Sequence, residues 1–514
     1  MDDKAGRREW IGLAVLALPS LLVSIDIFVL LLALPRLSAD LSASGTEQLW
    51  ILDSYGFLLS GFLITMGTLG DRIGRRKLLL VGAAAFGAAS VLAAYATSPA
   101  MLIASRALLG VAGATLTPST LALITNMFRN PKERPVAIGV WLMSLMGGIA
   151  LGPVVGGALL EHFWWGSVFL LGVPAMVLLL VLGPVLLPEY KAPRAGRIDL
   201  ASVALSLAAI LPAVWGLKEL ARNGLTTAPL AALAAGTAVG FAFVRRQVRL
   251  PDPLLDVRLF ADRAFTAALV CMLVNTMLPG ATMVLITQYL QLVEGLSPLR
   301  AGLWLLPTVA AAIATLQVSP LLARRVPPAR LIAGGLVVSA SGLVLLTRTP
   351  SSDGLAYVVT GLALINLGAG PLLTLGTNLV VGAAPPEKAG SAASISQTSN
   401  EFGFALGIAT MGTLATAVYR SRVDAPDGVP AMARDTLAGA SAAAANLPTQ
   451  VGTALLESAR AAFTAGLATV AGISAALVLG TAVLILVAMR HVRPVGAAQP
   501  SPEMPAGEPV ENVV

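Results

Sequence analysis

The sequence predicts an all-α polytopic membrane protein that crosses the bilayer fourteen times. Of its 514 residues, 56% are hydrophobic and only 12% are charged, and the mean hydropathy is +0.82. Soluble domains carry about 25% charged residues, so this chain lacks the polar surface that a water-soluble fold needs. Apolar stretches of about 18 residues or more, long enough to cross a bilayer, recur from one end to the other.

These helices fall into two sets of six with an extra pair between them. We expect an N-terminal six-helix bundle at 1–188, a two-helix insert with its linkers at 189–263, and a C-terminal six-helix bundle at 264–490. Residues 420–460 form a long, alanine-rich, part-helical loop, and the tail at 491–514 is expected to be disordered. The predicted helices lie at residues 10–35, 49–70, 77–97, 100–127, 136–160, 167–187, 199–217, 228–244, 264–290, 300–322, 330–347, 355–382, 391–419 and 461–489.

Lysine and arginine are distributed unevenly between the two predicted sides. An even helix number places both termini on one side, and most basic residues lie in the tails and loops of that side, while Lys218 is assigned to a loop on the other. By the positive-inside rule, both termini are cytoplasmic, in the plasma membrane of what the alanine and glycine usage indicates is a bacterium. The same asymmetry accounts for the net charge of +7 and argues against nucleic-acid binding.

Several functional classes find no support in the composition. The single cysteine, Cys271, cannot form an internal disulfide, and the two histidines, His162 and His491, are far from any set of metal ligands. The sequence contains no phosphate-binding loop and no clustered catalytic set, so an enzyme is not expected and no cofactor or metal is implied. A transporter of this sequence must use an ion gradient, or an ATPase supplied by another chain.

A run of small residues marks the fifth predicted helix. It reads G-x8-G-x3-G-P-x2-G-G and consists of Gly139, Gly148, Gly152, Pro153, Gly156 and Gly157. Small residues at i, i+4 and i+8 let membrane helices approach closely, and proline adds a bend. A generic tight helix pair is the alternative explanation. The full spacing resembles the fifth-helix motif of drug:proton antiporters in the major facilitator superfamily.

The loop after the second helix resembles a second motif of that superfamily, G-x-L-x-D-R-x-G-R-R. Its glycines allow a tight turn, its aspartate can face the positive end of a neighbouring helix, and its arginines can pair with carboxylates across the two halves. We expect a cytoplasmic latch that is closed when the transporter faces outward, with Glu133 and Arg134 as partners. A simple topogenic charge cluster is the alternative. The motif residues are Gly67, Asp71, Arg72, Gly74, Arg75 and Arg76.

Two ionisable residues lie deep in the first and fourth helices. Asp26 lies nine residues before Pro35, or about 13 Å from the helix end, near the middle of a core about 30 Å thick. Arg106 lies about 10 Å inside its helix. Such charges are costly and normally face a partner or a cavity. Asp26 to Pro35 resembles the antiporter first-helix pattern D-x-T-x4-A-L-P, with Phe28 in place of threonine.

The resemblance also implies roles for these residues. Arg106 and Gly110 match a fourth-helix R-x-x-x-G element that is associated with proton coupling, although a structural ion pair is the alternative. Asp53 and Tyr55 lie in a segment similar to quaternary-ammonium exporters, where the second-helix acid handles cations. An interfacial aspartate that stabilises the helix dipole would explain Asp53 equally well.

A polar stripe crosses the thirteenth helix near the midplane. Ser394, Gln397 and Glu401 share one helical face, with Asn400 beside them, and such a stripe must line a cavity rather than face lipid. Because burial disfavours the charged form of a carboxylate, Glu401 can exchange a proton near neutral pH or neutralise a cation. The family often carries further acids one turn earlier, where this chain has Ser396 and Gln397.

Aromatic residues near these acids are candidate contacts for a cation, although each could serve only in packing. They are Phe28, Tyr55, Trp141, Trp50 and Phe402. The tenth helix reads Leu306 to Ala312 where some relatives carry an acid. Fewer membrane carboxylates favour monovalent over divalent cations.

The resemblance therefore implies a fourteen-helix major facilitator fold and a proton-coupled antiporter that exports lipophilic, mainly cationic drugs, dyes and biocides by alternating access. Its partners would be these small molecules, protons and membrane lipids, and we expect a monomer. An exporter dedicated to one endogenous metabolite or antibiotic is the first alternative. A proton-coupled uptake permease is disfavoured by the complete fifth-helix motif.

Overall fold

The computed structural model describes residues 5–128, 130, 133–191, 199–250, 253, 257–261, 263–323, 325–383, 389–425 and 429–488. Within these ranges the regular secondary structure is helical, and 14 helical spans are long and apolar enough to cross a membrane. This confirms the predicted fold class. The tail at 491–514, for which disorder is predicted, lies outside the described residues.

Among the first six spans, helices that run in the same direction pack in pairs. α1 packs along α5, and α2 packs along α4, while α6 and α7 together make the sixth span. Ser44 and Glu47 form a capping box that starts α2, and Ser98 caps α4 just before Pro99. The helices are α1 (Arg7–Asp40), α2 (Gly45–Ile73), α3 (Arg75–Ala94), α4 (Pro99–Met127), α5 (Glu133–His162), α6 (Ser167–Leu170) and α7 (Val173–Leu186).

The last six spans include two π-helical turns, which continue α10 and α15 without a break in the chain direction. α13 packs on α14 and α19, and α10 packs on α15. The elements are α10 (Arg263–Gln288), η2 (Tyr289–Val293), α11 (Pro298–Trp304), α12 (Leu306–Leu322), α13 (Pro328–Leu346), α14 (Leu355–Ala383), α15 (Ala389–Gly407), η4 (Ile408–Gly412), α16 (Thr413–Arg422), α17 (Ala431–Asp435), α18 (Leu437–Ala444) and α19 (Thr449–Ala488).

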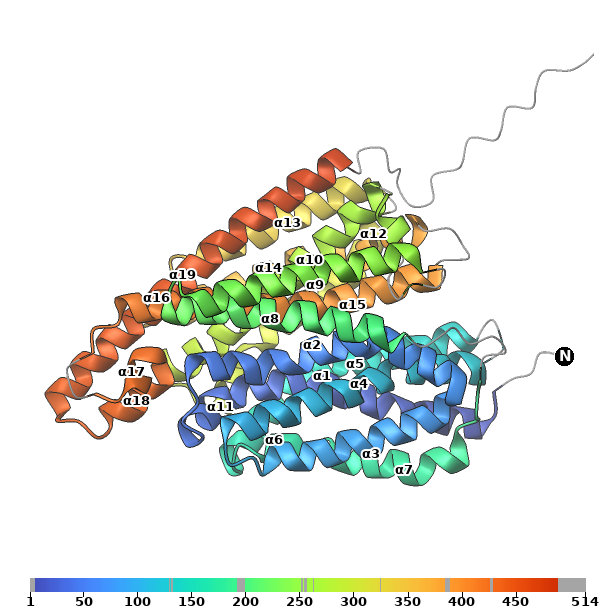
Figure 1. Ribbon diagram of the computed structural model, residues 1–514, viewed down its shortest axis with the longest axis horizontal. Helices are drawn as coiled ribbons and strands as arrows, with labels where there is room; N and C mark the ends of the chain where they lie inside the picture. Colours follow the sequence, from blue (N-terminus) through green and yellow to red (C-terminus); the bar gives the residue numbers. More distant parts are fainter. Residues whose placement is uncertain are drawn as a thin grey trace, which may run out of the picture.

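The two ends of the molecule differ in character. We call the end that carries the start of α1 and the α2–α3 turn the basic end, and the opposite end, with α17 and α18, the cap end (Figure 1). α19 has 40 residues and is about 60 Å long, roughly twice the apolar thickness of a bilayer. Its first turns pack against α18 at the cap end.

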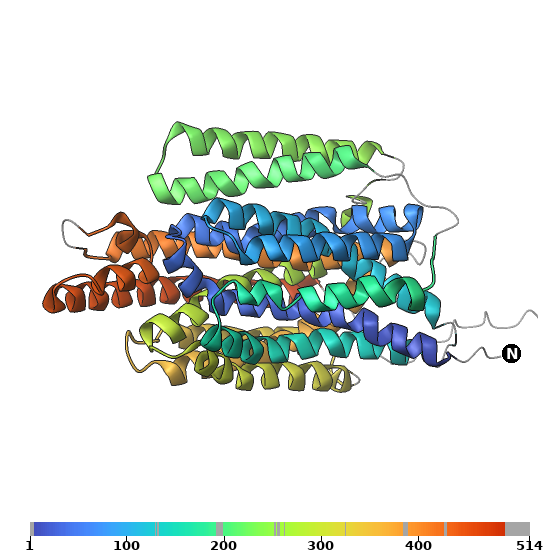
Figure 2. The same ribbon diagram turned by 90° about the horizontal axis from the view of Figure 1, so that it is seen from below.

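The two insert helices form a hairpin that lies along one side of the other helices (Figure 2). They are α8 (Leu200–Asn223) and α9 (Thr227–Arg249), and η1 (Val257–Ala261) follows them. Asp199 caps α8 and pairs with Arg246 of α9 at 2.9 Å. Burial raises the pKa of Asp199, but hydrogen bonds from Ser202 and Arg246 outweigh this and hold the pKa below its ordinary value.

α8 is longer than the sequence indicated, and this corrects the assignment of Lys218. The helix continues to Asn223 instead of ending at residue 217, so Lys218 lies inside it and not in a loop. The Lys218 side chain is 1% exposed and has a buried carboxylate partner, Asp53. Because Asp53 compensates the charge of Lys218, α8 can continue past this residue within the apolar layer.

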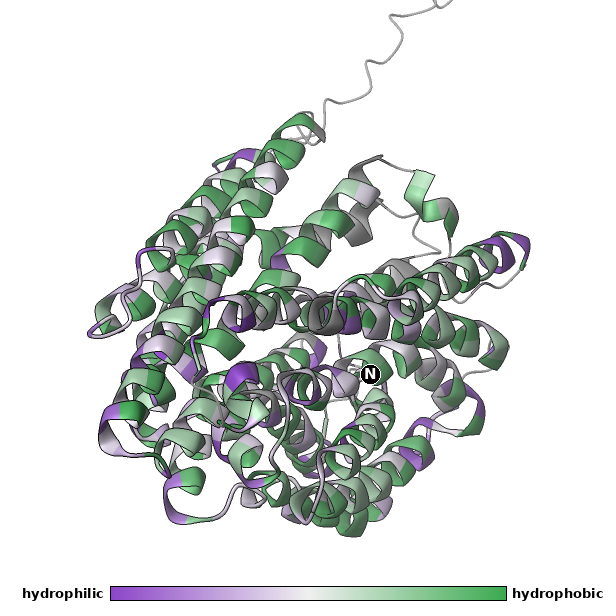
Figure 3. Ribbon diagram, turned by 60° about the vertical axis from the view of Figure 1, so that its left-hand side comes forward, coloured by the Kyte–Doolittle hydropathy of each residue, from purple (hydrophilic) through white to green (hydrophobic). Residues whose placement is uncertain are grey.

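Hydrophobic residues dominate most of the helical ribbon, as expected for surfaces that face lipid (Figure 3). α9 is an example, because Leu230, Phe241 and Val248 are between 48% and 69% exposed. Lipid tails cover such surfaces at no cost.

Glycines bring α1 and α5 into close contact, as expected for two positions of the fifth-helix motif. A Cβ on Gly148 would collide with the Leu21 carbonyl, and one on Gly156 would lie 2.7 Å from Cγ2 of Val29. Gly139 differs from this expectation, since no atom lies within 4 Å of its Cβ position. Gly139 lies near the basic end of α5, beyond the close contact with α1.

Alanine substitutions distinguish these two kinds of glycine. Gly156→Ala should lower the free energy of unfolding by about 1–3 kcal/mol, because the new methyl group overpacks the α1–α5 contact. Gly139→Ala should leave it unchanged or raise it by about 1 kcal/mol, since alanine is the better helix former. Thermal unfolding in detergent measures both, and equal effects at the two positions would contradict the close-contact explanation.

Candidate functional site

Two buried ion pairs lie on different faces of α2. The first joins α4 to α1, where Nη1 of Arg106 lies 2.8 Å from Oδ2 of Asp26. The Arg106 side chain is 2% exposed and that of Asp26 is 14% exposed. Two residues that the sequence singled out separately are therefore direct partners.

α2 supplies further contacts that hold Arg106 in place. Its Nε donates to the Ile51 carbonyl at 3.2 Å, and its guanidinium lies 4.5 Å from the centre of the Tyr55 ring. Carboxylate, carbonyl and aromatic face together compensate a charge at this depth. Arg106 thus connects three helices, α1, α2 and α4.

Glu401 faces the same cavity as Arg106. Its Oε1 accepts a hydrogen bond from Nε2 of Gln397 at 3.0 Å, and in the described part of the chain no lysine or arginine lies within 4 Å of its carboxylate. The side chains of Ser394 and Phe28 lie outside the described residues. The cavity is lined by Leu30, Leu31, Leu52, Tyr55, Gly56, Arg106, Glu401, Phe404, Ala405 and Ile408.

The second ion pair joins α2 to the insert. Nζ of Lys218 lies 2.7 Å from Oδ2 of Asp53, and the two side chains are 1% and 0% exposed. The ammonium also lies 3.9 Å from the centre of the Trp50 ring. Asp53 is thus a fully buried partner of α8, and this differs from the interfacial aspartate considered above.

Lys218 is the site residue that sequence reasoning missed. A signal was available, because Asp53 needed a cationic partner and Lys218 directly follows an apolar stretch that ends at Leu217. The predicted helix end placed that lysine in water. Only the packing of α8 on α2 shows that the two side chains meet.

Other predicted pocket residues occupy different places. Trp141 donates to Oγ of Ser20 at 2.7 Å and so joins α5 to α1. Phe402 packs against Phe57, with ring centres 5.9 Å apart. The Oδ1 atom of Asn400 and the Tyr55 hydroxyl are buried and have no hydrogen-bond partner among the described residues. Buried polar atoms without partners favour water or a ligand nearby.

A larger, mainly apolar cavity of about 960 Å³ lies nearer the basic end. Residues of α2, α8, α9, η1, α10 and α15 line it, and Phe402, which is one of them, directly follows Glu401 in α15. Its lining residues are Ser60, Gly61, Ile64, Ser206, Ile210, Phe243, Phe260, Leu269, Leu273, Ile395, Thr398, Ser399 and Phe402.

The arginines of the α2–α3 loop pair within the first six spans. Arg75 binds Asp71 at 2.7 Å, and Arg76 lies 3.6 Å from Glu189, which follows α7. Gly74 has φ +113°, a conformation that favours glycine, and Gly67 packs near Pro118 of α4. Arg72 is exposed.

The expected partners of this loop are bound elsewhere. Oε2 of Glu133 accepts from the backbone of Ala5 at 2.8 Å, and Nε of Arg134 donates to the Phe128 carbonyl at 3.0 Å. Among the described residues, neither side chain pairs with the loop arginines in this arrangement, where Arg76 pairs with Glu189. The latch that we expect in the outward-facing state stays a prediction.

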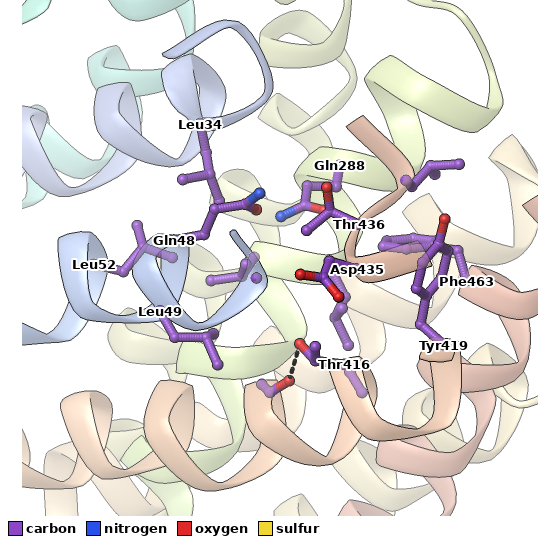
Figure 4. Close-up of a pocket in the computed structure, with 16 residues that line it drawn as sticks. Leu34, Gln48, Leu49, Leu52, Gln288, Thr416, Tyr419, Asp435, Thr436 and Phe463 are labelled. Carbon is purple, nitrogen blue, oxygen red and sulfur yellow. Dashed lines mark hydrogen bonds between the residues drawn. The ribbon is translucent and has the colours of Figure 1, made fainter. Parts of the chain in front are cut away.

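The cap end holds close contacts between the two halves. A Cβ on Gly157 would lie 2.6 Å from Leu299 of α11, Gly302 meets the Pro153 carbonyl, and Gln291 donates to the Leu32 carbonyl at 3.0 Å. Figure 4 shows a pocket of about 520 Å³ near this end, where Gln48 of α2 lies across from Asp435 and Thr416. Asp435 is held by Arg420 at 2.5 Å.

The sequence is similar to a known family and to named proteins. A family model described as Major Facilitator Superfamily matches residues 16–408. The chain is 46% identical to the "Multidrug efflux pump LfrA" of Mycolicibacterium smegmatis, over 94% of this chain and 97% of that protein. It is 35% identical to the "Methyl viologen resistance protein SmvA" of Salmonella typhimurium, over 89% and 93% of the two chains.

Solved structures show the same fold. A bacterial homolog of the human lysosomal transporter Spinster, in an inward-facing and unoccupied conformation, superposes with a TM-score of 0.66 at 18% identity, over 94% of this chain and 99% of that one. A peptide transporter POT in complex with sulfate gives a TM-score of 0.63 at 18% identity, over 92% and 94%.

Neutralising one partner of the Arg106–Asp26 pair should cost more than neutralising both. Arg106→Leu leaves the Asp26 carboxylate without its cation and should lower the free energy of unfolding by about 3–5 kcal/mol. Asp26→Asn in that background should recover much of the loss. Thermal or denaturant unfolding in detergent tests this, and purely additive effects would show that the two residues do not interact.

Proposed function

This chain belongs to the Major Facilitator Superfamily, and we propose that it is a proton-coupled antiporter that exports lipophilic, mainly cationic small molecules. Family membership makes it a multi-pass membrane transporter and not an enzyme. The observation that carries the proposal is the cavity that Glu401 shares with Arg106, the ion-pair partner of Asp26. The names of the two relatives, an efflux pump and a methyl viologen resistance protein, support efflux as the direction.

Asp26, Asp53 and Glu401 differ in whether their carboxylates are already paired with a cation of the protein. Asp26 is paired with Arg106 and Asp53 with Lys218, whereas the hydrogen-bond partner of Glu401 is the neutral amide of Gln397. A cation that enters the cavity therefore meets Glu401 first. Because a proton and a cation compete for one carboxylate, protonation from outside would release the cation. Asp26 becomes available only if Arg106 moves.

The larger cavity near the basic end supports a lipophilic substrate. Its walls come from α2, α8, α9, α10 and α15, and they are mainly apolar. With the basic end in the cytoplasm, this cavity lies at the level of the inner leaflet. An apolar body could rest there while its charge reaches toward Glu401, beyond Phe402.

The described contacts fit an arrangement that is closed at the cap end. Leu299 against Gly157 and Gln291 against Leu32 close that end, while Arg75 and Arg76 bind carboxylates within their own half. Alternating access would separate the cap-end contacts and let the loop arginines pair across the halves. Ligands bias such a cycle only if they bind the two states unequally.

We place the protein in the bacterial plasma membrane as a monomer, with both termini in the cytoplasm. The basic residues of the α2–α3 loop support this orientation. In this arrangement α17, α18 and the first turns of α19 form an outer cap.

Transport of ethidium into or out of liposomes under an imposed pH gradient tests the function. Glu401→Gln should lower gradient-driven transport at least about tenfold, because a lost charge interaction with a cation is worth about 1.5–3 kcal/mol. In the wild type, ethidium binding should weaken as the pH falls, because protons take the carboxylate. The glutamine variant should lose this pH dependence.

Glu457→Gln, at an exposed position of α19, is the matched control and should transport like the wild type. If folded wild-type protein moves no lipophilic cation, a dedicated metabolite exporter becomes the better proposal. If the wild type transports and Glu401→Gln transports equally well, Glu401 is not the coupling acid.

Cysteine labelling tests the orientation. In a Cys271→Ser background, a membrane-impermeant maleimide should label Ala442→Cys, an exposed position of the otherwise largely buried α18, in intact cells. It should label Lys77→Cys, an exposed position in the first turn of α3, only after the cells are permeabilised. The reverse pattern would invert the proposed topology and with it the direction of transport.

A further inference from the structure

Trp50 and Asp53 of α2 form a cage that already holds an ammonium group. The two residues are three apart on one helical face, and the Lys218 ammonium lies 2.7 Å from the carboxylate and 3.9 Å from the indole centre. A carboxylate beside an aromatic face is the chemistry that recognises organic ammonium ions. The cation in the cage belongs to the chain itself.

Lys218 does not use all the bonding capacity of this cage. Oδ1 of Asp53 is buried and accepts no hydrogen bond from the described residues. Leaving such an atom unpaired is unfavourable, so the geometry is not the one expected of a purely structural anchor. A narrow crevice adjoins Lys218 on the cap side, lined by Thr46, Leu49, Thr413, Thr416, Ala417 and Arg420.

The cage is close to the main cavity. Asp53 precedes Gly56 by three residues, or about one helical turn toward the cap end. A Cβ on Gly56 would lie 2.9 Å from Ala405 and 3.8 Å from the Glu401 carbonyl. The same turn of α2 therefore approaches Glu401 on one side and carries the cage on another.

Lys218 belongs to α8 of the insert, which lies outside the two sets of six spans. α8 rests on α2 and α15 through an apolar cluster that contains Phe57, Val214, Ala405 and Ala409. This cluster could anchor α8 without any charge. A lysine at position 218 thus has a consequence beyond anchoring: it neutralises Asp53, which lies one turn of α2 from the approach of Gly56 to α15.

We propose that Lys218 acts as an internal cation that occupies a second cation site, formed by Trp50 and Asp53, and thereby restricts the substrates to those with a single positive charge. The proposal rests on the proposed export of lipophilic cations. Without the Lys218 ammonium, the cage would accept an organic ammonium group, so a dication could bind Glu401 and Asp53 together. Lys218 is then a determinant of specificity.

Two probes with identical head groups test this proposal: decyltrimethylammonium, with one charge, and decamethonium, with two. Their affinities for purified protein in detergent are measured by competition with ethidium. The ratio of the two affinities is compared among wild type, Lys218→Met, Lys218→Arg and the double variant Asp53→Asn/Lys218→Met. A ratio cancels losses that affect both ligands alike.

Lys218→Met should shift the ratio toward decamethonium by about tenfold, the gain expected from one additional charge interaction. Lys218→Arg should keep the wild-type ratio, and the double variant should lose the gain because Asp53 no longer carries a charge. Lys218→Gln, whose amide can still donate to Asp53, provides the same comparison if the methionine variant does not purify in a folded form.

An unchanged ratio in Lys218→Met and Lys218→Gln would overturn the proposal and leave Lys218 as an anchor of α8. A gain that persists in the double variant would also overturn it, because the second charge would then bind elsewhere than Asp53. Failure of the proposed function has a different signature, since wild-type protein would then bind neither cation.

Discussion

The cost of burying charge in an apolar layer is the constraint on which this structure depends. This cost is offset by ion pairs on two faces of α2. On one, Arg106 of α4 reaches across the Ile51 carbonyl and the Tyr55 ring to Asp26 of α1, and on the other Asp53 meets Lys218 of α8. A single buried charge would be strongly unfavourable, but in each pair the two opposite charges compensate each other. Each pair thereby joins helices that are distant in sequence. α2 is thus held in place by charges on both sides.

This arrangement leaves Glu401 as the distinctive acid. It shares a cavity with Arg106, the ion-pair partner of Asp26, and its described hydrogen-bond partner is an amide. A carboxylate without a protein cation can take a proton or an organic cation, and a transporter that exchanges the two needs such a group. The ion pairs around it do not compete for this role. They set the electrostatic surroundings of the Glu401 carboxylate.

The insert hairpin is integrated into the site as well as into the fold. Its first helix contributes Lys218 to the Asp53 pair and Ile210 to the apolar cavity, so the additional spans line both polar and apolar surfaces. Meanwhile α17, α18 and the first turns of α19 extend the second half beyond one apolar layer at the cap end. The insert hairpin and the α17–α19 extension both lie where the two halves meet. A change between facing states would alter the contacts there.

The sequence by itself determined the fold class, the fourteen spans and the depth of Asp26, Arg106 and Glu401, because hydropathy and charge position depend on local composition alone. It also indicated the close α1–α5 contact at Gly148 and Gly156 through their spacing. Only the tertiary structure decided which charges pair. Asp26 and Arg106 are 80 residues apart, and Asp53 and Lys218 are 165 apart, so no periodicity relates them. The end of α8 was misplaced for the same reason. A lysine beside an apolar run indicates a helix end in water, and only the packing of α8 against α2 shows that Asp53 compensates its charge.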